Sequence, residues 1–305
     1  MSDNFILLLF NLFILAMLLI DLGVAQRREH FPSMKEAIAW SCLWIILAFL
    51  FGLFIWYERG SSKALEYFTG YLVEEALSVD NVFVFIVIFS YFAVPHKTHH
   101  KVLFWGVLSA IILRALFIVL GAALVAKFHW ILYLLGAFLV FTAAKLALQK
   151  ETEVHPERNP VLNLARRVFP VTADYEGGKF FVRREGKRLI TPLFLVLLMI
   201  ETTDIAFATD SIPAIFAITR DTFIIYTSNI FAVLGLRSLY FVVAGFMKQF
   251  RFLKYGLSAV LAFVGVKMLI EPWTGIPILY SLLIIFAIIT TSILASLKPL
   301  NAKGE

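Results

Sequence analysis

Apolar residues occur along this chain in nine runs that are each long enough to cross a membrane. A helix needs about 20 such residues to span the ~30 Å hydrocarbon core of a bilayer, and 61% of the sequence is hydrophobic. We therefore predict an all-α polytopic membrane protein with about nine transmembrane helices, forming one membrane domain over residues 1–305. The predicted spans are 5–24, 39–57, 64–91, 102–126, 128–148, 191–218, 222–247, 252–271 and 276–297.

The basic residues indicate how these spans are oriented. Of the 27 Lys and Arg residues, 19 follow odd-numbered spans or lie in the C-terminal tail, counting Lys254 with the loop that it adjoins. Four lie in the other loops, and this imbalance predicts an N-terminus outside and a C-terminus in the cytoplasm. Since these loops account for the net charge of +6, we expect a lipid bilayer and no nucleic acid as partner. Protein partners stay unknown.

An internal repeat relates two three-span segments, residues 64–148 and 191–271. Tyr133–Lys145 aligns without gaps with Tyr255–Lys267. Further upstream the repeats pair Arg114 with Arg237, Asp80 with Asp210 and Glu74 with Asp204. Because each repeat holds an odd number of spans, we predict two inverted three-helix repeats, the plan of many secondary transporters. Two leading helices within 5–57 and a final helix at 276–297 flank them.

Residues 149–190 form the long polar loop between the two repeats. The stretch Asn163–Val168 is typical of a short basic amphipathic helix at the lipid surface, and Lys179–Ile190 of a small β-hairpin. A solvated cytoplasmic linker with anionic-lipid contacts is the simplest interpretation, because basic cytoplasmic loops are common. A regulatory role for this loop stays open.

Six carboxylates lie deep within two of the predicted spans, three in each repeat. They are Glu74, Glu75 and Asp80 in the first repeat, and Glu201, Asp204 and Asp210 in the second. A charged side chain at the centre of a bilayer costs about 2.5–3.5 kcal/mol even on a lenient insertion scale. Acids in such positions require a reason, and we interpret them as one polar site inside the membrane domain.

The polar side chains of the two acidic stretches offer oxygen atoms as metal ligands, and neither stretch contains Cys or His. Such ligands suit hard divalent cations such as Mn²⁺, Mg²⁺ or Ca²⁺. The predicted metal-binding residues are Glu74, Asp80, Asn81, Glu201, Asp204, Asp210 and Ser211. Accessory candidates are Ser78, Thr209, Asn229, Arg114 and Arg237.

Helix geometry places the acids of each repeat on different faces. In the first repeat Asp80 points more than about 90° away from Glu74, and in the second Asp210 lies nearly opposite Glu201. Pro213 lacks an N–H and clashes with the carbonyl four residues back, which predicts a kink beside Asp210. A helix broken there could turn its polar groups toward one centre, which the interior of a membrane protein tolerates beside a wet cavity.

Two other interpretations of the acids stay open. They could form ion pairs that hold the bundle together, with Arg114, Arg237, Lys145 and Lys267 as partners. They could also relay protons without a metal. The two arginines stand at matching repeat positions, so either could neutralise the site when it holds no cation.

Three histidines, His96, His99 and His100, stand together in one predicted loop. They are candidates for metal capture, although a plain solvated loop is the simpler interpretation. The single cysteine, Cys42, excludes an intrachain disulfide and a CxxC pair, and we predict that it is a buried small hydrophobe. No phosphate-binding Gly-rich loop, GxSxG or HExxH motif is present, so we expect neither an enzyme nor a permanently bound cofactor.

The acidic stretches resemble those of the TerC family of membrane proteins, with the strongest likeness to its Alx-type branch from bacterial inner membranes. The likeness is carried by Glu74–Phe85, Asp204–Ile218 and Tyr226–Tyr240, within a region from about Ala37 to Ile270. This family has been tied to tellurite resistance, to redox modulation and to Mn²⁺ export that includes a response to alkaline pH. The resemblance therefore implies a multi-pass protein of a bacterial inner membrane.

Carried over residue by residue, the resemblance implies that Glu74, Asp80, Glu201, Asp204 and Asp210 are the transport acids. Many relatives have a basic residue after the first Glu, and this chain departs from that pattern by having a second acid there. We predict a secondary transporter that exports Mn²⁺ as its substrate, with H⁺ entry as a candidate coupling. The alternative is a non-transporting membrane partner in a tellurite-resistance or redox-modulating complex, acting through the 149–190 loop.

Overall fold

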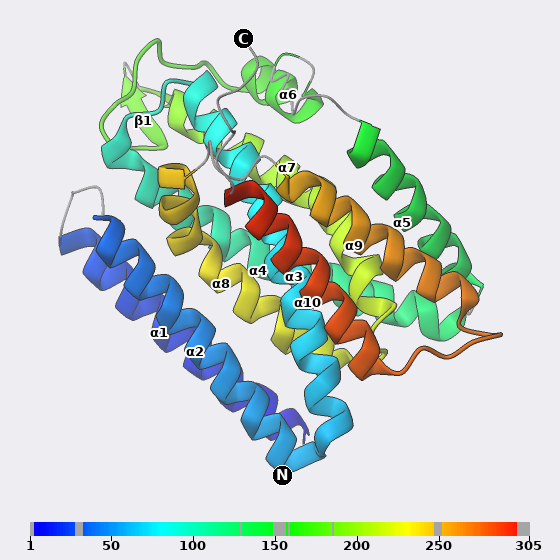
Figure 1. Cartoon of the computed structure of the whole chain (residues 1–305). Helices are drawn as coiled ribbons and strands as arrows, with labels where there is room; N and C mark the ends of the chain where they lie inside the picture. The colour runs from blue at the N-terminus through cyan, green and yellow to red at the C-terminus, as the bar shows by residue number, and fades with distance from the viewer. Residues whose placement is uncertain are drawn as a thin grey trace, which may run out of the picture.

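The computed structural model describes residues 3–27, 33–128, 130–148, 157, 159–184, 186–246 and 252–297. These residues form a bundle of long helices with one small hairpin (Figure 1). The helices are α1 (Asp3–Arg27), α2 (Met34–Arg59), α3 (Ser61–Tyr91), α4 (His96–Lys127), α5 (Ile131–Leu148), α6 (Pro160–Val168), α7 (Pro192–Phe216), α8 (Thr222–Phe246), α9 (Leu253–Ile270) and α10 (Ile278–Leu297). The antiparallel strands are β1 (Phe181–Arg184) and β2 (Lys187–Ile190).

Each of the nine predicted spans corresponds to a long helix, and the ends differ by only a few residues. Within the described residues, seven helices are long and apolar enough to cross a membrane by length and composition. In α1 the apolar part, Phe5–Ile20, is shorter, and α3 carries Glu74, Glu75 and Asp80 in its interior. The all-α polytopic membrane class is confirmed, whereas the count of nine spans stays a prediction.

The outer surface of the bundle is apolar. Large hydrophobic side chains are exposed on α1, α2, α4, α5 and α10, among them Leu8, Phe49, Val119, Phe141 and Phe286. Cys42 is also exposed on α2, so the prediction that it is buried was wrong. An apolar exterior of this extent suits contact with lipid, because a soluble monomer rarely exposes large apolar patches.

Helices α5 and α9, the third helices of the two predicted repeats, pack closely. A Cβ atom added to Gly265 would lie 2.9 Å from the carbonyl oxygen of Gly136, so a larger residue would separate the two backbones. The hydroxyl of Ser258 donates a hydrogen bond to the carbonyl oxygen of Ala143 at 2.7 Å. The contacts advance along α5 while they move backward along α9, so these two helices are antiparallel.

The repeat alignment pairs Gly136 with Ser258 and Ala143 with Gly265. If the two repeats are exchanged, the contact of Gly136 with Gly265 therefore becomes the contact of Ser258 with Ala143. The first helices of the repeats, α3 and α7, also contact each other, as do the second helices, α4 and α8. Each helix therefore packs on its own counterpart. This arrangement agrees with a pseudo-two-fold relation between oppositely directed repeats, which is the plan expected for inverted repeats.

Helix α7 is continuous through Pro213 and ends three residues later, at Phe216. The predicted broken helix beside Asp210 was therefore wrong, and α3 is likewise continuous past Asp80. Pro213 removes the one ladder hydrogen bond that a backbone N–H there would donate to Thr209, and the helix continues for three residues beyond it. The acids consequently keep the separate faces that regular helix geometry gives them.

The described part of the 149–190 loop contains both elements expected from its sequence. Asn159 caps α6, because its side-chain oxygen accepts hydrogen bonds from the backbone N–H groups of Val161 and Leu162, at 2.9 and 3.2 Å. Leu162 is fully buried, and α6 packs on α7. The hairpin and α6 lie at the same end of the bundle, hereafter the hairpin end (Figure 1). Residues 149–156, 158 and 185 lie outside the described residues.

Candidate functional site

Four of the acids of α3 and α7 fall into two pairs, each with one member from either repeat. Glu74 and Asp204 form the first pair, on the side of α4 and α8. Asp80 and Asp210 form the second pair, which borders a cavity beside α5 and α9. The two paired acids of each helix (Glu74 and Asp80, or Asp204 and Asp210) are six residues apart, which separates their directions by about 120° on a regular helix. Intact helices therefore split the predicted single site into two layers.

The first layer is built around Arg114 of α4, which is fully buried. Its guanidinium forms an ion pair with Glu74 and a second one with Asp204, with 3.1 Å between Nη2 and Oδ1. The side-chain oxygen of Asn229 on α8 lies 3.4 Å from Nη1. Asn81 accepts from Nη2 at 3.3 Å in the amide orientation that satisfies its neighbours. We call these residues the arginine layer.

One guanidinium faces two carboxylates in the arginine layer, so the layer keeps an excess of negative charge when both acids are ionised. Oδ2 of Asp204 and Nδ2 of Asn229 have no hydrogen-bond partner among the described residues. Removing one member of a buried ion pair is far more destabilising than losing a surface pair, because the remaining charge stays in a low-dielectric environment. This layer therefore combines a structural lock with an unsatisfied polar edge.

The second layer lines a cavity of about 380 Å³. Asp80 and Asp210 face it from opposite repeats and lie close enough to interact electrostatically. The hydroxyl of Thr142 on α5 donates to Oδ1 of Asp210 at 3.1 Å. Lys145, one turn further along α5, also lines the cavity and interacts with Asp210, and Lys254 interacts with Asp80. We call this group the cavity layer.

Neutral oxygen groups complete the lining of the cavity. Asn81, Thr209 and Ser211 all border it. The hydroxyl of Ser211 is buried without a hydrogen-bond partner among the described residues, as is that of Ser78 in α3. A buried hydroxyl without a partner is unfavourable unless water or a ligand satisfies it. The cavity layer thus offers two carboxylates together with amide and hydroxyl oxygens.

Glu201 belongs to neither layer. Its carboxylate accepts a hydrogen bond from Ser109 of α4, and its second oxygen is buried without a hydrogen-bond partner among the described residues. The next residue, Thr202, accepts a hydrogen bond from the Asn159 side chain at 2.8 Å. Glu201 therefore lies between the arginine layer and the point where α6 docks on α7.

The remaining acid of the first stretch, Glu75, faces another part of the bundle. Its carboxylate lies beside Gly235 of α8, with Trp44 of α2 nearby, and it shares a hydrogen bond with Tyr71. This position is separate from both layers. It agrees with leaving Glu75 out of the predicted ligand set.

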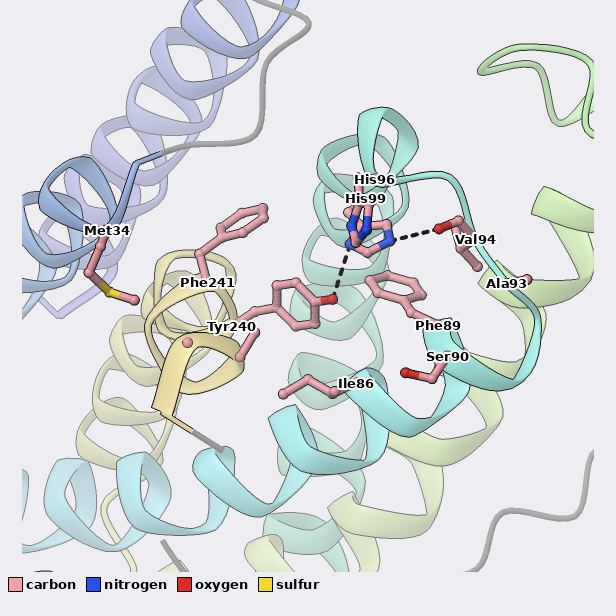
Figure 2. A pocket seen from close by; sticks show the side chains of 12 residues that line it. Met34, Ile86, Phe89, Ser90, Ala93, Val94, His96, His99, Tyr240 and Phe241 are labelled. Atoms are coloured by element: carbon pink, nitrogen blue, oxygen red, sulfur yellow. Dashed lines mark hydrogen bonds between the residues drawn. The ribbon is translucent and has the colours of Figure 1, made fainter. Parts of the chain in front are cut away.

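The histidines do not form a metal site in the described part of the chain. His99 is buried, with Nε2 3.1 Å from the Val94 carbonyl oxygen and Nδ1 3.1 Å from the Tyr240 hydroxyl (Figure 2). Both ring nitrogens therefore have protein partners. The ring also packs on Phe89 and on His96 at the edge of a cavity of about 490 Å³. A packing role explains His99 better than metal capture.

No group of three or more His, Cys, Asp or Glu side chains is close enough to hold a metal ion among the described residues. The structure does not gather the seven predicted ligands at one point. A divalent cation in the cavity layer would be held by Asp80 and Asp210, by neutral oxygens and by water. Such a mixed, partly hydrated oxygen shell is usual for hard cations.

Sequence reasoning missed two partners of the acids. Thr142, the donor to Asp210, aligns with Val264 in the second repeat, so a hydroxyl stands where the other repeat has an aliphatic side chain. That difference could have pointed to it. Ser109, the partner of Glu201, has no comparable signal, because its role depends on a contact across 92 residues of chain.

The fold and these polar layers define the class of the protein: an α-helical multi-pass membrane protein with acids from two repeats meeting in its interior. Comparison of sequences identifies its family. The model of the "Integral membrane protein TerC family" matches residues 59–303, and the chain belongs to the TerC family.

Relatives extend over nearly the whole chain. An "Uncharacterized membrane protein STKORF319" of Myxococcus xanthus is 50% identical over 288 residues, which is 94% of this chain and 90% of the relative. The "Putative membrane-bound redox modulator Alx" of Escherichia coli (strain K12) is 45% identical over 289 residues, covering 92% and 90%. An "Uncharacterized membrane protein" of Rickettsia felis is 40% identical, covering 96% and 98%. No solved structure matches the chain.

Proposed function

We propose that this protein is a secondary transporter that exports a divalent cation from the cytoplasm, with Mn²⁺ as the first candidate substrate. The observation that carries the proposal is the cavity layer. Asp80 and Asp210 come from matching positions of the two repeats and face one cavity of about 380 Å³. Secondary transporters with inverted repeats bind their substrates at such a repeat interface.

The chemistry of the cavity favours a hard divalent cation. Two carboxylates can balance a charge of +2, and Thr142, Asn81 and Ser211 add neutral oxygen-bearing groups. Among the described residues, no Cys or His lines this cavity, which makes soft ions such as Cu⁺ poor candidates. Lys145 is exposed at the cavity edge, and its positive charge would weaken retention of the ion and so assist release.

Protons are the proposed coupling ion. A carboxylate must be deprotonated to bind metal, so protonation of Asp80 and Asp210 lowers metal affinity and metal binding releases protons. Proton entry from outside could therefore discharge the metal there and reset the site. We place the coupling in the cavity layer, because the acids of the arginine layer already have a fixed cation, Arg114.

Transport of Mn²⁺ into inverted membrane vesicles tests the proposal. The parent protein is expected to accumulate Mn²⁺, and Asp80→Asn and Asp210→Asn are each expected to abolish uptake while the protein still inserts. Asp221→Asn is the matched control, since Asp221 forms ion pairs with Lys63 and Arg59 away from the cavity. Uptake at the parent rate in both cavity variants would contradict the site, and no uptake of Mn²⁺, Mg²⁺ or Ca²⁺ by the parent would contradict the function.

A second candidate function is that of a non-transporting membrane partner in a redox-modulating or tellurite-resistance complex. The Escherichia coli relative is called a "Putative membrane-bound redox modulator Alx", and this name favours the redox-modulating role. Such a protein would act through the 149–190 loop. Replacing this loop by a short flexible linker should then abolish the cellular phenotype, while Asp80→Asn and Asp210→Asn leave it intact. The opposite pattern is expected for a transporter.

A further inference from the structure

The two acids of the arginine layer are related to each other by the pseudo-two-fold symmetry of the repeats. The repeat alignment pairs Glu74 with Asp204, so exchange of the repeats maps this pair of acids onto itself. The same exchange maps Arg114 onto Arg237. The two acids therefore have two symmetry-related candidate partners, one from each repeat.

In this structure the acids are bound by the arginine of the first repeat. Arg114 is fully buried and forms ion pairs with both Glu74 and Asp204. Its counterpart Arg237 is half-buried on α8, and α8 reaches the arginine layer through Asn229 instead. The local arrangement is thus asymmetric, although the second repeat has an arginine at the equivalent position.

The same asymmetry holds in the cavity layer. Thr142 of α5 lines the cavity and binds Asp210, whereas its counterpart on α9, Val264, is only 1% exposed. Lys145 lines the cavity beside Asp210, whereas its counterpart Lys267 interacts with acids outside both layers, Glu271 and Glu66. For Arg114, Thr142 and Lys145, the residue of the first repeat takes the position beside the acids, whereas Lys254 of the second repeat interacts with Asp80.

Asymmetry of this kind is expected when inverted repeats adopt two different conformations at one time. Alternating access arises when the repeats or bundles rock against each other around a fixed site. If the two repeats exchange conformations, each contact made by one repeat is replaced by the equivalent contact of the other. We propose that Arg237 is a positioning residue that replaces Arg114 between Glu74 and Asp204 in the oppositely facing state.

The repeat alignment gives the two arginines equivalent places on their helices. Asn229, which contacts the guanidinium of Arg114, stands eight residues before Arg237 on α8. Its counterpart Gly106 stands eight residues before Arg114 on α4 and lies close to Glu201. Eight residues span about 12 Å of a regular helix, so α8 must shift relative to α3 and α7 before Arg237 can reach the two acids. In the second state the Val264 face of α9 opens, and the Thr142 face of α5 closes.

This inference rests on the proposed transport function for its purpose, but its test requires no transport. Two reporters are introduced separately into the full-length Cys42→Ser protein, which removes the one native cysteine. They are Thr142→Cys and Val264→Cys. A membrane-impermeant maleimide is applied to vesicles of either orientation without added Mn²⁺, so the labelling rate reports which face of the bundle is open. Loss of transport in the parent would leave this measurement unaffected.

Removing either arginine should change the labelling rates of the two reporter cysteines in opposite directions. With Arg237→Gln, Val264→Cys labelling from the side opposite the hairpin end is expected to fall by about tenfold or more, because the second state loses its buried ion pair. With Arg114→Gln, Val264→Cys labelling is expected to rise and Thr142→Cys labelling from the hairpin side to fall. Arg220→Gln is the matched control, since Arg220 pairs with the exposed Glu271, and it should change neither rate.

Unchanged rates in the Arg237→Gln protein would overturn the proposal, as would rates that both rise or both fall. Arg237→Lys, which keeps a positive charge, should restore part of the Val264→Cys labelling. Should Arg114→Gln fail to fold, the Arg237→Gln and Arg237→Lys pair decides the question alone. A structural role for Arg237 would lower the yield of the variant without moving the two reporters in opposite directions.

Discussion

The arginine layer and the cavity layer are built from equivalent acids but have different surroundings. Each contains one carboxylate from α3 and one from α7, at positions that the repeat alignment pairs. In the arginine layer a buried guanidinium binds both acids. In the cavity layer the two acids border a space of about 380 Å³, and the lysines nearby are the exposed Lys145 and the half-buried Lys254.

This difference separates the two tasks that buried acids can have in a membrane. A fixed internal cation makes an acid pair part of the scaffold, because the cost of burying the charges is offset within the protein. An acid pair without such a cation can accept an exchangeable one, either a metal ion or protons. The comparison predicts that changes in the arginine layer affect stability and that changes in the cavity layer affect binding.

The largest effect on stability is expected for Arg114→Met. It leaves the carboxylates of Glu74 and Asp204 without their cation in a buried site, and breaking a buried ion pair from one side costs about 3–5 kcal/mol. Thermal unfolding in detergent should therefore begin at a much lower temperature. The triple variant Arg114→Met with Glu74→Gln and Asp204→Asn should recover part of the loss, because it removes all three charges. Asp210→Ala, measured alongside, should have a smaller effect, and equal losses would erase the distinction between the layers.

A smaller effect, on binding, is expected for Thr142→Val. This change removes the hydroxyl that donates to Asp210 at 3.1 Å, and a hydrogen bond to a charged group is worth about 1.5–3 kcal/mol. The dissociation constant for Mn²⁺, measured by calorimetry on the purified protein, should rise by about tenfold or more. Thr142→Ser keeps the hydroxyl and should bind as the parent does. Unchanged binding in the Thr142→Val protein would show that the hydroxyl does not position Asp210 for the metal.

The general architecture was accessible from sequence because the bilayer limits the possibilities. Apolar runs of spanning length can form only helices or closed barrels in lipid, and the runs here are too long and too uniformly apolar for strands. The alignment of Tyr133–Lys145 with Tyr255–Lys267 relates α5 to α9, and these two helices pack against each other. The amphipathic helix α6 and the β1–β2 hairpin were also predicted from local pattern.

The internal arrangement of the site was less accessible. Helix geometry indicated that Glu74 and Asp80 face different directions, but the kink expected at Pro213 suggested a way to bring the acids together. Because Pro213 stands in the last turn of α7, the helix stays intact and the two layers stay apart. The sequence also could not decide which arginine binds the acids, since Arg114 and Arg237 occupy equivalent repeat positions. That choice depends on the conformation of each repeat.

The pH dependence of metal binding should distinguish the layers further. Since Asp80 and Asp210 must be ionised to bind a metal, the affinity for Mn²⁺ should rise with pH until both are deprotonated. The expected slope is up to about tenfold per pH unit for each proton released. Mn²⁺ titrations at several pH values would measure it. Asp210→Asn should reduce the number of protons released by one, and a slope that Asp210→Asn leaves unchanged would place the coupling elsewhere.

The smallest effect is expected at the hairpin end, where Asn159 links α6 to α7. Its side chain caps α6 and donates to Thr202, the residue after Glu201. Loss of an N-cap costs about 1 kcal/mol, so Asn159→Ala should speed proteolytic cleavage near α6 by several-fold in membranes. Asn159→Asp keeps the cap but cannot donate to Thr202. If α6 only covers the bundle end, Asn159→Asp should behave as the parent does in Mn²⁺ uptake. A changed uptake rate would instead connect α6, through Thr202 and Glu201, to the two layers.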